Sequence, residues 1–244
     1  FTNTCILQFT NHKFNKMKKL ILTLFLFSGF FANSQYCTFF DFEAKEPEMV
    51  VSTLKGMMET GWGKNIQGTK SLFAYQFNGT NKATHSVQFC FPDEKAFASF
   101  FSTWAMSVDA QLFGEKLGKF SEPVSQSLNT PVWYKNDWAN DNAFMLYQME
   151  VNDPAAYLKE FKSFSQKMAK KLGFENNSYG LAYPIVGKTA EFSHFVWIGS
   201  PSVEEALTRT KQMFADPLFA EFSKNVSGIR KVVNTTLSVR VMDF

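Results

Sequence analysis

The sequence has little of what most metal, redox and nucleophilic sites need. It holds three histidines and three cysteines in 244 residues. The cysteines form no CxxC pair and no Cys/His cluster, so we expect no cysteine-based zinc site. A Gly-rich phosphate loop, a GxSxG elbow and an HExxH motif are all missing. Nucleotide-dependent enzymes and the standard hydrolases therefore have no support in the sequence.

Basic charge is also scarce once the first residues are set aside. The net charge of +3 includes four lysines within residues 1–34, a stretch without any acidic residue, so residues 35–244 carry a net charge of −1. A nucleic-acid surface needs clustered Lys and Arg to meet the phosphates, and no such cluster occurs. We expect no nucleic-acid partner.

The first 34 residues are predicted to lie outside the folded protein. Residues 1–16 contain no methionine and precede Met17, so we interpret them as translated upstream sequence or an added segment. Residues 17–34 have the parts of a secretory signal peptide: Lys18 and Lys19, an apolar run over 20–31, and small residues before Gln35. The apolar run is shorter than the roughly 20 residues that a membrane span needs. We therefore expect a periplasmic or secreted protein with no membrane partner after cleavage.

The rest of the chain matches itself in two halves, 35–134 and 143–244, joined by a polar linker over 135–142. Four matches occur in the same order at nearly constant spacing. They are 43–47 with 150–154 at an offset of 107, Ala74-Tyr75 with Ala182-Tyr183 at 108, and His85 with His194 and Phe113 with Phe222 at 109. This internal repeat predicts that both halves share one architecture.

Each half predicts the element order βαββαβ. The expected strands cover 38–44, 72–77, 85–91 and 124–134 in the first half, and 144–151, 181–185, 194–198 and 232–242 in the second. The first helix of each half begins at Pro47 or Pro154, since proline suits the first helical turn, and has apolar residues three and four apart. A second helix carries apolar positions from Phe97 to Leu112 in the first half. In the second half, Asp216-Pro217 is expected to kink or break it.

A βαββαβ unit folds into a four-stranded antiparallel sheet with both helices on one face, the ferredoxin-like arrangement. The predicted fold class is thus α+β, a tandem duplication whose two sheets enclose a barrel-like space. This order resembles the dimeric α+β barrel superfamily in a fused form. Residues 201–219 are similar to the second helix of antibiotic-biosynthesis-monooxygenase-like and NIPSNAP-like domains. The resemblance implies a range that includes cofactor-free oxygenases, haem proteins and isomerases, and the fold does not choose among them.

The two histidines beyond residue 34 occupy equivalent positions and are the first candidate catalytic residues. If each hairpin pairs about its loop, Tyr75 faces His85 and Tyr183 faces His194, and the tyrosine could orient the imidazole for proton transfer. The alternative is a core histidine, because His85 is in register with the apolar residues of its strand. No cofactor is expected, although a haem ligated by one of the histidines is a further alternative.

The opposite strand faces are expected to line the space between the sheets. Candidate ligand-binding residues there are Gln88, Trp197, Ser238 and Arg240, a mixture that suits a small molecule. An arginine inside such a space needs an anionic partner, which a ligand carboxylate would supply. The alternative for Arg240 is a solvent-exposed edge position.

Cys37 and Cys90 fall on strands that are antiparallel neighbours in the ferredoxin-like order, toward the same end of the sheet. Disulfides persist in the compartment that the signal peptide implies. A bridge requires Cβ atoms within about 4 Å, so a disulfide and two buried thiols both stay open.

Three functions are compatible with these observations. The first is an exported protein that binds a small hydrophobic or aromatic molecule between its sheets, as a monomer or homodimer, without established catalysis. The second is a cofactor-independent monooxygenase or isomerase using a His/Tyr pair, and the third is a structural or protein-interaction module. A cavity of at least about 300 Å³ favours binding, a histidine opening into it favours the enzyme, and a filled interior with an exposed apolar patch favours the module.

Overall fold

The computed structural model describes residues 35–187 and 192–244; the segments interpreted as upstream sequence and signal peptide lie outside the described residues. Eight strands are described: β1 (Tyr36–Ala44), β2 (Thr69–Phe77), β3 (His85–Phe91), β4 (Ser121–Lys135), β5 (Ala143–Val151), β6 (Tyr179–Val186), β7 (His194–Ser200) and β8 (Arg230–Asp243). They form one closed antiparallel barrel in the order β1-β3-β2-β8-β5-β7-β6-β4.

Each half contributes a ferredoxin-like sheet to this barrel. The first half has the order β4-β1-β3-β2 and the second has β8-β5-β7-β6. The sheets join at both edges, where β2 pairs with β8 and β4 pairs with β6. The predicted α+β fold of two βαββαβ units is confirmed, and the enclosed space between the units is the interior of a single barrel.

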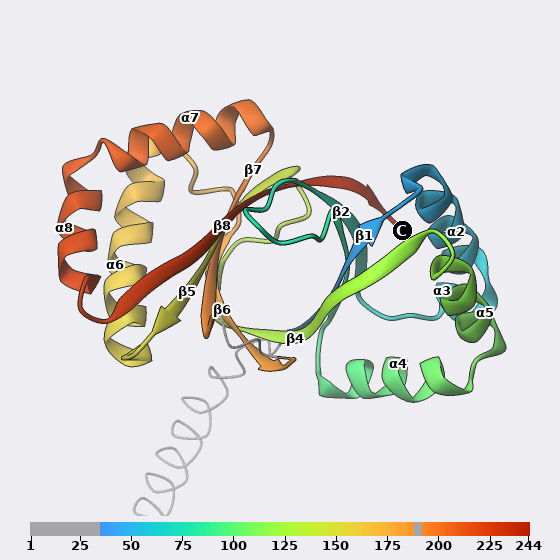
Figure 1. Ribbon diagram of the computed structural model, residues 1–244. Helices are drawn as coiled ribbons and strands as arrows, with labels where there is room; N and C mark the ends of the chain where they lie inside the picture. The colour runs from blue at the N-terminus through green and yellow to red at the C-terminus, as the bar shows by residue number, and fades with distance from the viewer. Residues whose placement is uncertain (1–34, 188–191) are drawn as a thin grey trace, which may run out of the picture. The chain divides into compact units, whose positions relative to one another are not determined.

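Helices cover the outside of the barrel in two groups (Figure 1). The first half supplies α2 (Pro47–Glu59), α3 (Gly61–Lys64), α4 (Glu94–Met106) and α5 (Val108–Leu117), and the second supplies α6 (Pro154–Leu172), α7 (Val203–Phe214) and α8 (Pro217–Val226). Within the described ranges, no helix combines the length and the apolar character that crossing a bilayer requires.

The second helix is broken in both halves, not only in the second. The expected break is confirmed at Asp216, whose side chain accepts a hydrogen bond from the Leu218 amide at the start of α8. In the first half the expected continuous helix is wrong, because Ser107 accepts a hydrogen bond from the Ala110 amide and caps a new helix. Phe101 in α4 and Val108 in α5 are 64% and 68% exposed, so these two residues do not join the core.

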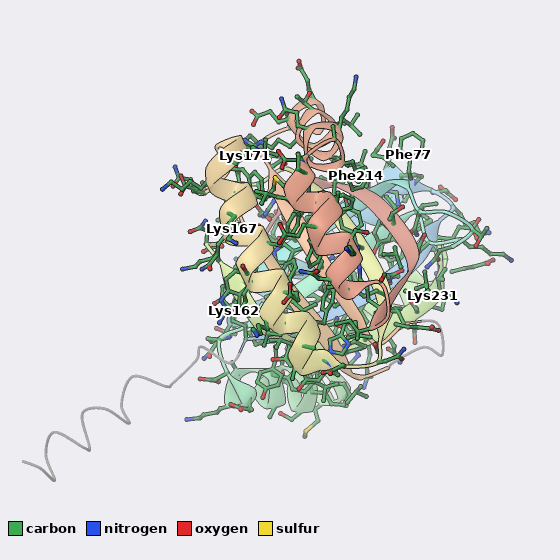
Figure 2. All side chains as sticks on the ribbon, turned by 90° about the vertical axis from the view of Figure 1, so that its left-hand side faces the viewer. Phe77, Lys162, Lys167, Lys171, Phe214 and Lys231 are labelled. Carbon is green, nitrogen blue, oxygen red and sulfur yellow. A yellow bond between two sulfur atoms is a disulfide. The ribbon has the colours of Figure 1, made fainter. Side chains whose placement is uncertain are left out.

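The helix α6 shows why its sequence forms an amphipathic element on this sheet. Lys162, Lys167 and Lys171 lie along its exposed side (Figure 2), whereas Phe161 and Met168 are buried against the strands. Pro154 begins the helix, and Gly173 ends it in the left-handed conformation with φ of 70°.

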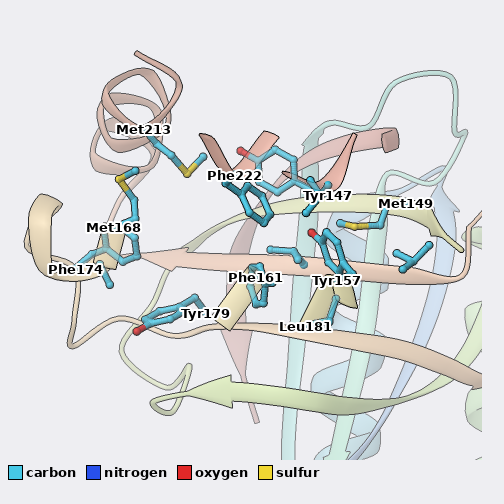
Figure 3. Packing of buried hydrophobic residues seen from close by; sticks show 14 residues of the cluster. Tyr147, Met149, Tyr157, Phe161, Met168, Phe174, Tyr179, Leu181, Met213 and Phe222 are labelled. Carbon is cyan, nitrogen blue, oxygen red and sulfur yellow. The ribbon is translucent and has the colours of Figure 1, made fainter. Parts of the chain in front are cut away.

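Two hydrophobic cores lie between the helices and the sheets, one in each half. The core under α6, α7 and α8 contains Tyr157, Phe161, Met168 and Phe222 together with residues of β5, β6 and β7 (Figure 3). The core of the first half joins α2, α4 and α5 to β2 and β3. Since strand side chains alternate between faces, the other face of every strand is left to fill the barrel.

Candidate functional site

The barrel interior is the candidate site, and it divides into two chambers. The inner chamber has a volume of about 80 Å³, and a mainly aromatic cluster forms part of its wall. The cluster consists of Phe73, Phe144, Ala182, Phe195 and Trp197. The outer chamber has a volume of about 630 Å³. Phe39, Asn129, Leu146 and Phe195 line both, so the two chambers meet at these four residues.

The outer chamber lies at the end of the barrel where the two hairpins turn. Asn78, Thr80 and Asn81 of the β2–β3 loop contribute to its lining, as does Gly187 at the end of β6. Gly79 and Gly187 have positive φ values of 58° and 74°, which favour glycine. A Cβ on Gly187 would also collide with the backbone of Gln126, so this wall depends on glycine.

A partly buried carboxyl group is the main polar feature of the outer chamber. Asp41 Oδ1 accepts a hydrogen bond of 2.8 Å from the Tyr75 hydroxyl, and Oδ2 accepts one of 2.8 Å from Ser125 Oγ. Ser86 pairs with Asp41 across the β1–β3 ladder and is completely buried. Strands β2 and β4 thus each donate a hydroxyl group to one carboxylate, and the neighbouring Ser86 Oγ has no hydrogen-bond partner within the described residues.

The electrostatics of this cluster differ from those of an exposed aspartate. Burial raises the pKa of Asp41 above its usual value, and the hydrogen bonds from Ser125 and Tyr75 oppose the shift. Burial also raises the pKa of Tyr75 well above 10, and the charge of Asp41 adds to that effect. Tyr75 therefore stays a neutral donor at physiological pH.

The opposite wall of the outer chamber is polar and comes from the second half. Asn234 Nδ2 donates to Gln148 Oε1 at 3.2 Å, and Thr236 Oγ1 donates to Asn78 Oδ1 at 2.9 Å. The second of these bonds links β8 to the β2–β3 loop. The chamber therefore offers hydrogen-bonding groups on both sides of an aromatic floor that includes Phe39.

The inner chamber contains three of the predicted ligand-binding residues and the two cysteines. Gln88, Trp197 and Ser238 line it, and Cys37 and Cys90 form a disulfide in its wall. Two of its buried polar atoms, Trp197 Nε1 and Asn129 Oδ1, have no hydrogen-bond partner within residues 35–187 and 192–244. A ligand or water molecule that hydrogen-bonds to this donor and this acceptor would remove the free-energy cost of leaving them unpaired.

The predicted pairing of Tyr75 with His85 is wrong. Ala74 lies opposite His85 in the β2–β3 ladder, and a shift of one residue moves a side chain to the other face of the sheet. Tyr75 consequently points into the barrel, whereas His85 lies on the helix side, stacked on Phe42 with ring centres 5.9 Å apart. Its Nδ1 is 2.9 Å from Thr84 Oγ1, and burial lowers the pKa of the imidazole.

The second histidine also lies outside the chambers. His194 and Tyr183 are in contact, with ring centres 5.9 Å apart, and Ser193 Oγ is 3.0 Å from His194 Nδ1. Their neighbours in the ladder, Ala182 and Phe195, pair with each other and line the inner chamber. Because faces alternate along a strand, the His194–Tyr183 pair is on the outer face of β6 and β7.

Arg240 is neither a free ligand anchor nor an exposed edge residue. Its side chain is 8% exposed, Nε donates to the Asp141 carbonyl at 3.0 Å, and Nη1 donates to Asp243 Oδ1 at 2.7 Å. Nη2 donates to the Trp138 carbonyl, so three donor atoms are used by the chain itself. The guanidinium also lies over the Phe73 and Phe144 rings, at 5.5 and 5.8 Å. Arg240 thus holds the linker against the part of the barrel that contains Phe73 and Phe144.

A haem bound through histidine does not fit this interior. No histidine is among the described residues that line either chamber. The described part of the chain also has no cluster of three His, Cys, Asp or Glu side chains placed to hold a metal ion. The chemistry that the site offers instead is hydrogen bonding and proton exchange at a carboxyl group.

Asp41 and Ser125 are the site residues that sequence reasoning missed. A signal was available for Asp41, since it is an acidic residue that directly follows Phe39 and Phe40 in the largely apolar strand YCTFFDFEA. An acid within such a run needs partners. Ser125 gives no comparable signal, because it lies in a polar stretch of β4.

Comparison with known proteins agrees with the barrel architecture. No family model and no curated protein matches the chain. An anthrone oxidase-like protein matches with a TM-score of 0.59 and 9% identity, covering 88% of this chain and 94% of that one. A proposed monooxygenase from Lactobacillus acidophilus has a TM-score of 0.56 and 12% identity over 86% and 94%.

A proposed chlorite dismutase also matches, with a TM-score of 0.52 and 10% identity over 86% of this chain and 96% of that one. At these identities the likeness is one of fold alone. The protein therefore shares the α+β barrel fold of these structures.

Proposed function

We propose that the protein binds a small hydrophobic or aromatic molecule inside the barrel. The observation that carries the proposal is the outer chamber of about 630 Å³. Ligand pockets of proteins start at about 300 Å³ and combine apolar walls with a few polar groups. Phe39 and Phe195, whose ring centres are 5.7 Å apart, supply an aromatic wall, and Asp41 supplies the polar group.

A neutral aromatic probe tests whether the interior binds ligands at all. We expect 2-phenylethanol to bind the purified protein with saturable heat in isothermal titration calorimetry. Gln148→Trp adds a bulky ring to the chamber wall and should abolish the heat. The matched control is Gln76→Trp, on an exposed position of β2, which should leave binding unchanged. No saturable heat with the wild type, or equal binding by both variants, would contradict the proposal.

An enzyme that transfers protons is the second candidate, supported by the environment of Asp41. Buried carboxyl groups with shifted pKa values in a cavity are typical of catalytic sites. Neither histidine of the His/Tyr pairs proposed from the sequence for a cofactor-independent monooxygenase or isomerase lines the chambers, so Asp41 takes the place of the histidine. In an isomerase, the carboxylate would remove a proton from a carbon next to a carbonyl group and return it to another atom of the substrate, without a co-reactant.

Hydrogen exchange distinguishes this enzyme from a simple binder. Incubation of 1-phenyl-2-propanone with the protein in D₂O should give deuterium uptake beside the carbonyl, and Asp41→Asn should lose it. Uptake that is absent, or equal in the variant, would remove the enzyme candidate and leave binding alone.

A protein contact is the third candidate and rests on a different surface. Phe101, Met106, Val108 and Leu112 are exposed around the turn between α4 and α5, at 58–84%. Exposed apolar groups of this kind can mark an interaction site. This surface does not account for the chamber, so we place binding first.

We also propose that the protein is exported and that its halves arose by duplication and fusion of one unit. Support for export comes from the signal-peptide pattern over 17–34 and from the Cys37–Cys90 disulfide, a bond typical of oxidising compartments. Support for duplication comes from the same βαββαβ order in each half. Detection of the chain without residues 17–34 outside the cytoplasm would test export.

A further inference from the structure

We propose that the ligand of the outer chamber is a small aromatic compound carrying a cationic group, such as a protonated amine, and that Asp41 binds this group. The inference rests on the proposed function and adds the chemical class of the ligand. It follows from the charges that line the chamber, the acceptor sites left on Asp41 and the spacing between Asp41 and the aromatic wall.

The charges lining the outer chamber are of one sign. Asp41 and Glu150 are its acidic residues, and no Lys, Arg or His is among the described residues of its lining. Lys231 pairs with Glu150 at 3.9 Å but is 74% exposed, so it acts at the rim. Arg240, the group expected to attract an anion, is used by chain carbonyls and Asp243 and is not part of this lining. The chamber thus disfavours an anionic ligand.

Asp41 has room for one more donor. An ionised carboxylate offers about four acceptor positions, and the Tyr75 and Ser125 hydroxyls occupy one on each oxygen. The neighbouring Ser86 can occupy a third, which leaves at least one position. The two hydroxyl groups that donate, those of Tyr75 and Ser125, favour the charged form of the carboxyl group, which is the form that binds a cation.

The spacing of the wall sets the shape of the ligand. Phe39 and Asp41 lie two residues apart on the inner face of β1, a separation of about 7 Å along a strand. A ring against Phe39 and Phe195 then leaves a gap that two or three bonds can span to reach the carboxylate. Aromatic faces and a carboxylate are also the two groups that recognise organic ammonium ions in proteins.

Three compounds of similar shape and different charge test the inference. 2-Phenylethylamine is cationic at pH 7.5, 2-phenylethanol is neutral and 3-phenylpropanoate is anionic. In isothermal titration calorimetry, we expect the amine to bind at least about tenfold more tightly than the alcohol, as expected for a charge pair away from water. The anion should bind more weakly than the alcohol.

Variants then assign the preference to Asp41. Asp41→Asn keeps the size and the hydrogen-bond acceptor, so the alcohol should bind as before, while the advantage of the amine falls to less than about threefold. The control is Glu150→Gln, which removes the rim carboxylate and should leave most of the advantage in place.

The outcomes separate this inference from the proposed function. Binding of the alcohol without preference for the amine, or an amine preference lost only in Glu150→Gln, would overturn the cation site while leaving a binding chamber. Failure of both the amine and the alcohol to bind would overturn the proposed function as well. Thermal unfolding of each variant verifies that the fold is intact.

Discussion

The Tyr75 hydroxyl donates a hydrogen bond of 2.8 Å to Asp41 across the intervening strand β3. The bond passes over Ser86, which pairs with Asp41 in the ladder and is fully buried. It fixes a charged group inside a barrel whose inner end is aromatic. Burying a carboxylate costs free energy, so a functional role is the physical reason we assign to it.

The first prediction concerns the stability of Asp41→Asn. Burial raises the pKa of Asp41 above its ordinary 3.8, so the folded protein binds this proton more tightly than the unfolded chain does. The free energy of unfolding of the wild type therefore gains from Asp41 as the pH falls through the folded-state pKa, and the gain is complete below 3.8. We expect the Asn variant to be more stable at pH 7.5 by about 0.5–2 kcal/mol.

The advantage of the variant should shrink as the pH is lowered toward 4. Urea unfolding at several pH values measures it, with Asp137→Asn as a control on the exposed linker. A constant difference across this range would contradict the raised pKa of Asp41, and a variant that is less stable at pH 7.5 would show that Asp41 is a stabilising residue.

The second prediction concerns the disulfide in the wall of the inner chamber. Cys37 and Cys90 are 53 residues apart, and the chain-entropy model assigns roughly 4 kcal/mol to a loop of this length. We expect the double variant Cys37→Ala/Cys90→Ala to lose about 2–4 kcal/mol in the free energy of unfolding. The wild type under reducing conditions should lose a similar amount. Equal urea midpoints with and without reductant would contradict this.

The third prediction concerns Arg240, which is hydrogen-bonded to carbonyl groups of the linker. Arg240→Ala leaves the Trp138 and Asp141 carbonyls without their donor and removes the charge over two phenylalanine rings. We expect a loss of about 2–4 kcal/mol in urea unfolding. Lys231→Ala, at a 74% exposed ion pair, should change stability by less than about 0.5 kcal/mol. A neutral Arg240→Ala that instead weakens binding of an anionic ligand would restore the original ligand-anchor interpretation.

Particular residues show how much of the fold and of the site could be predicted from the sequence. The element order followed from periodicity and prolines, and the strand expected over 85–91 has the bounds His85–Phe91. The break at Ser107 was missed because a serine in a helical pattern carries a weaker signal than Asp-Pro. The site was harder to predict than the fold. The sequence match pairs Tyr75 with Tyr183 at an offset of 108, which differs by one residue from the correspondence between the two halves in the structure.

That single residue decides which side chains enter the barrel. Ala74, not Tyr75, is the structural counterpart of Tyr183, because each lies opposite a histidine in its hairpin. Hairpin register depends on the conformation of the turn, which composition alone does not specify. The prediction for Arg240 was wrong for a different reason. Two of its partners are backbone carbonyls of the linker, and no residue pattern in the sequence indicates such partners.

The fourth prediction concerns Gly180, which lies opposite Trp197 in the β6–β7 ladder. A Cβ at this position would lie 2.6 Å from Trp197 Cζ2 and from Tyr134 Cβ. Gly180→Ala should therefore displace the Trp197 ring, shift its fluorescence and cost about 1–3 kcal/mol of stability. The control is Gly228→Ala, where a Cβ meets open space and the effect should be neutral or stabilising. Equal behaviour of the two variants would mean that the ring is not packed as described.

The most direct test of the account is a crystal structure of the protein grown with 2-phenylethylamine. We expect electron density for one ligand in the outer chamber. Its ring should lie near Phe39 and Phe195, and its ammonium nitrogen should lie within about 3 Å of an Asp41 carboxylate oxygen. Ligand density only on the outside of the barrel, or a chamber filled by the protein's own side chains, would contradict the central claim that this barrel is a binding site.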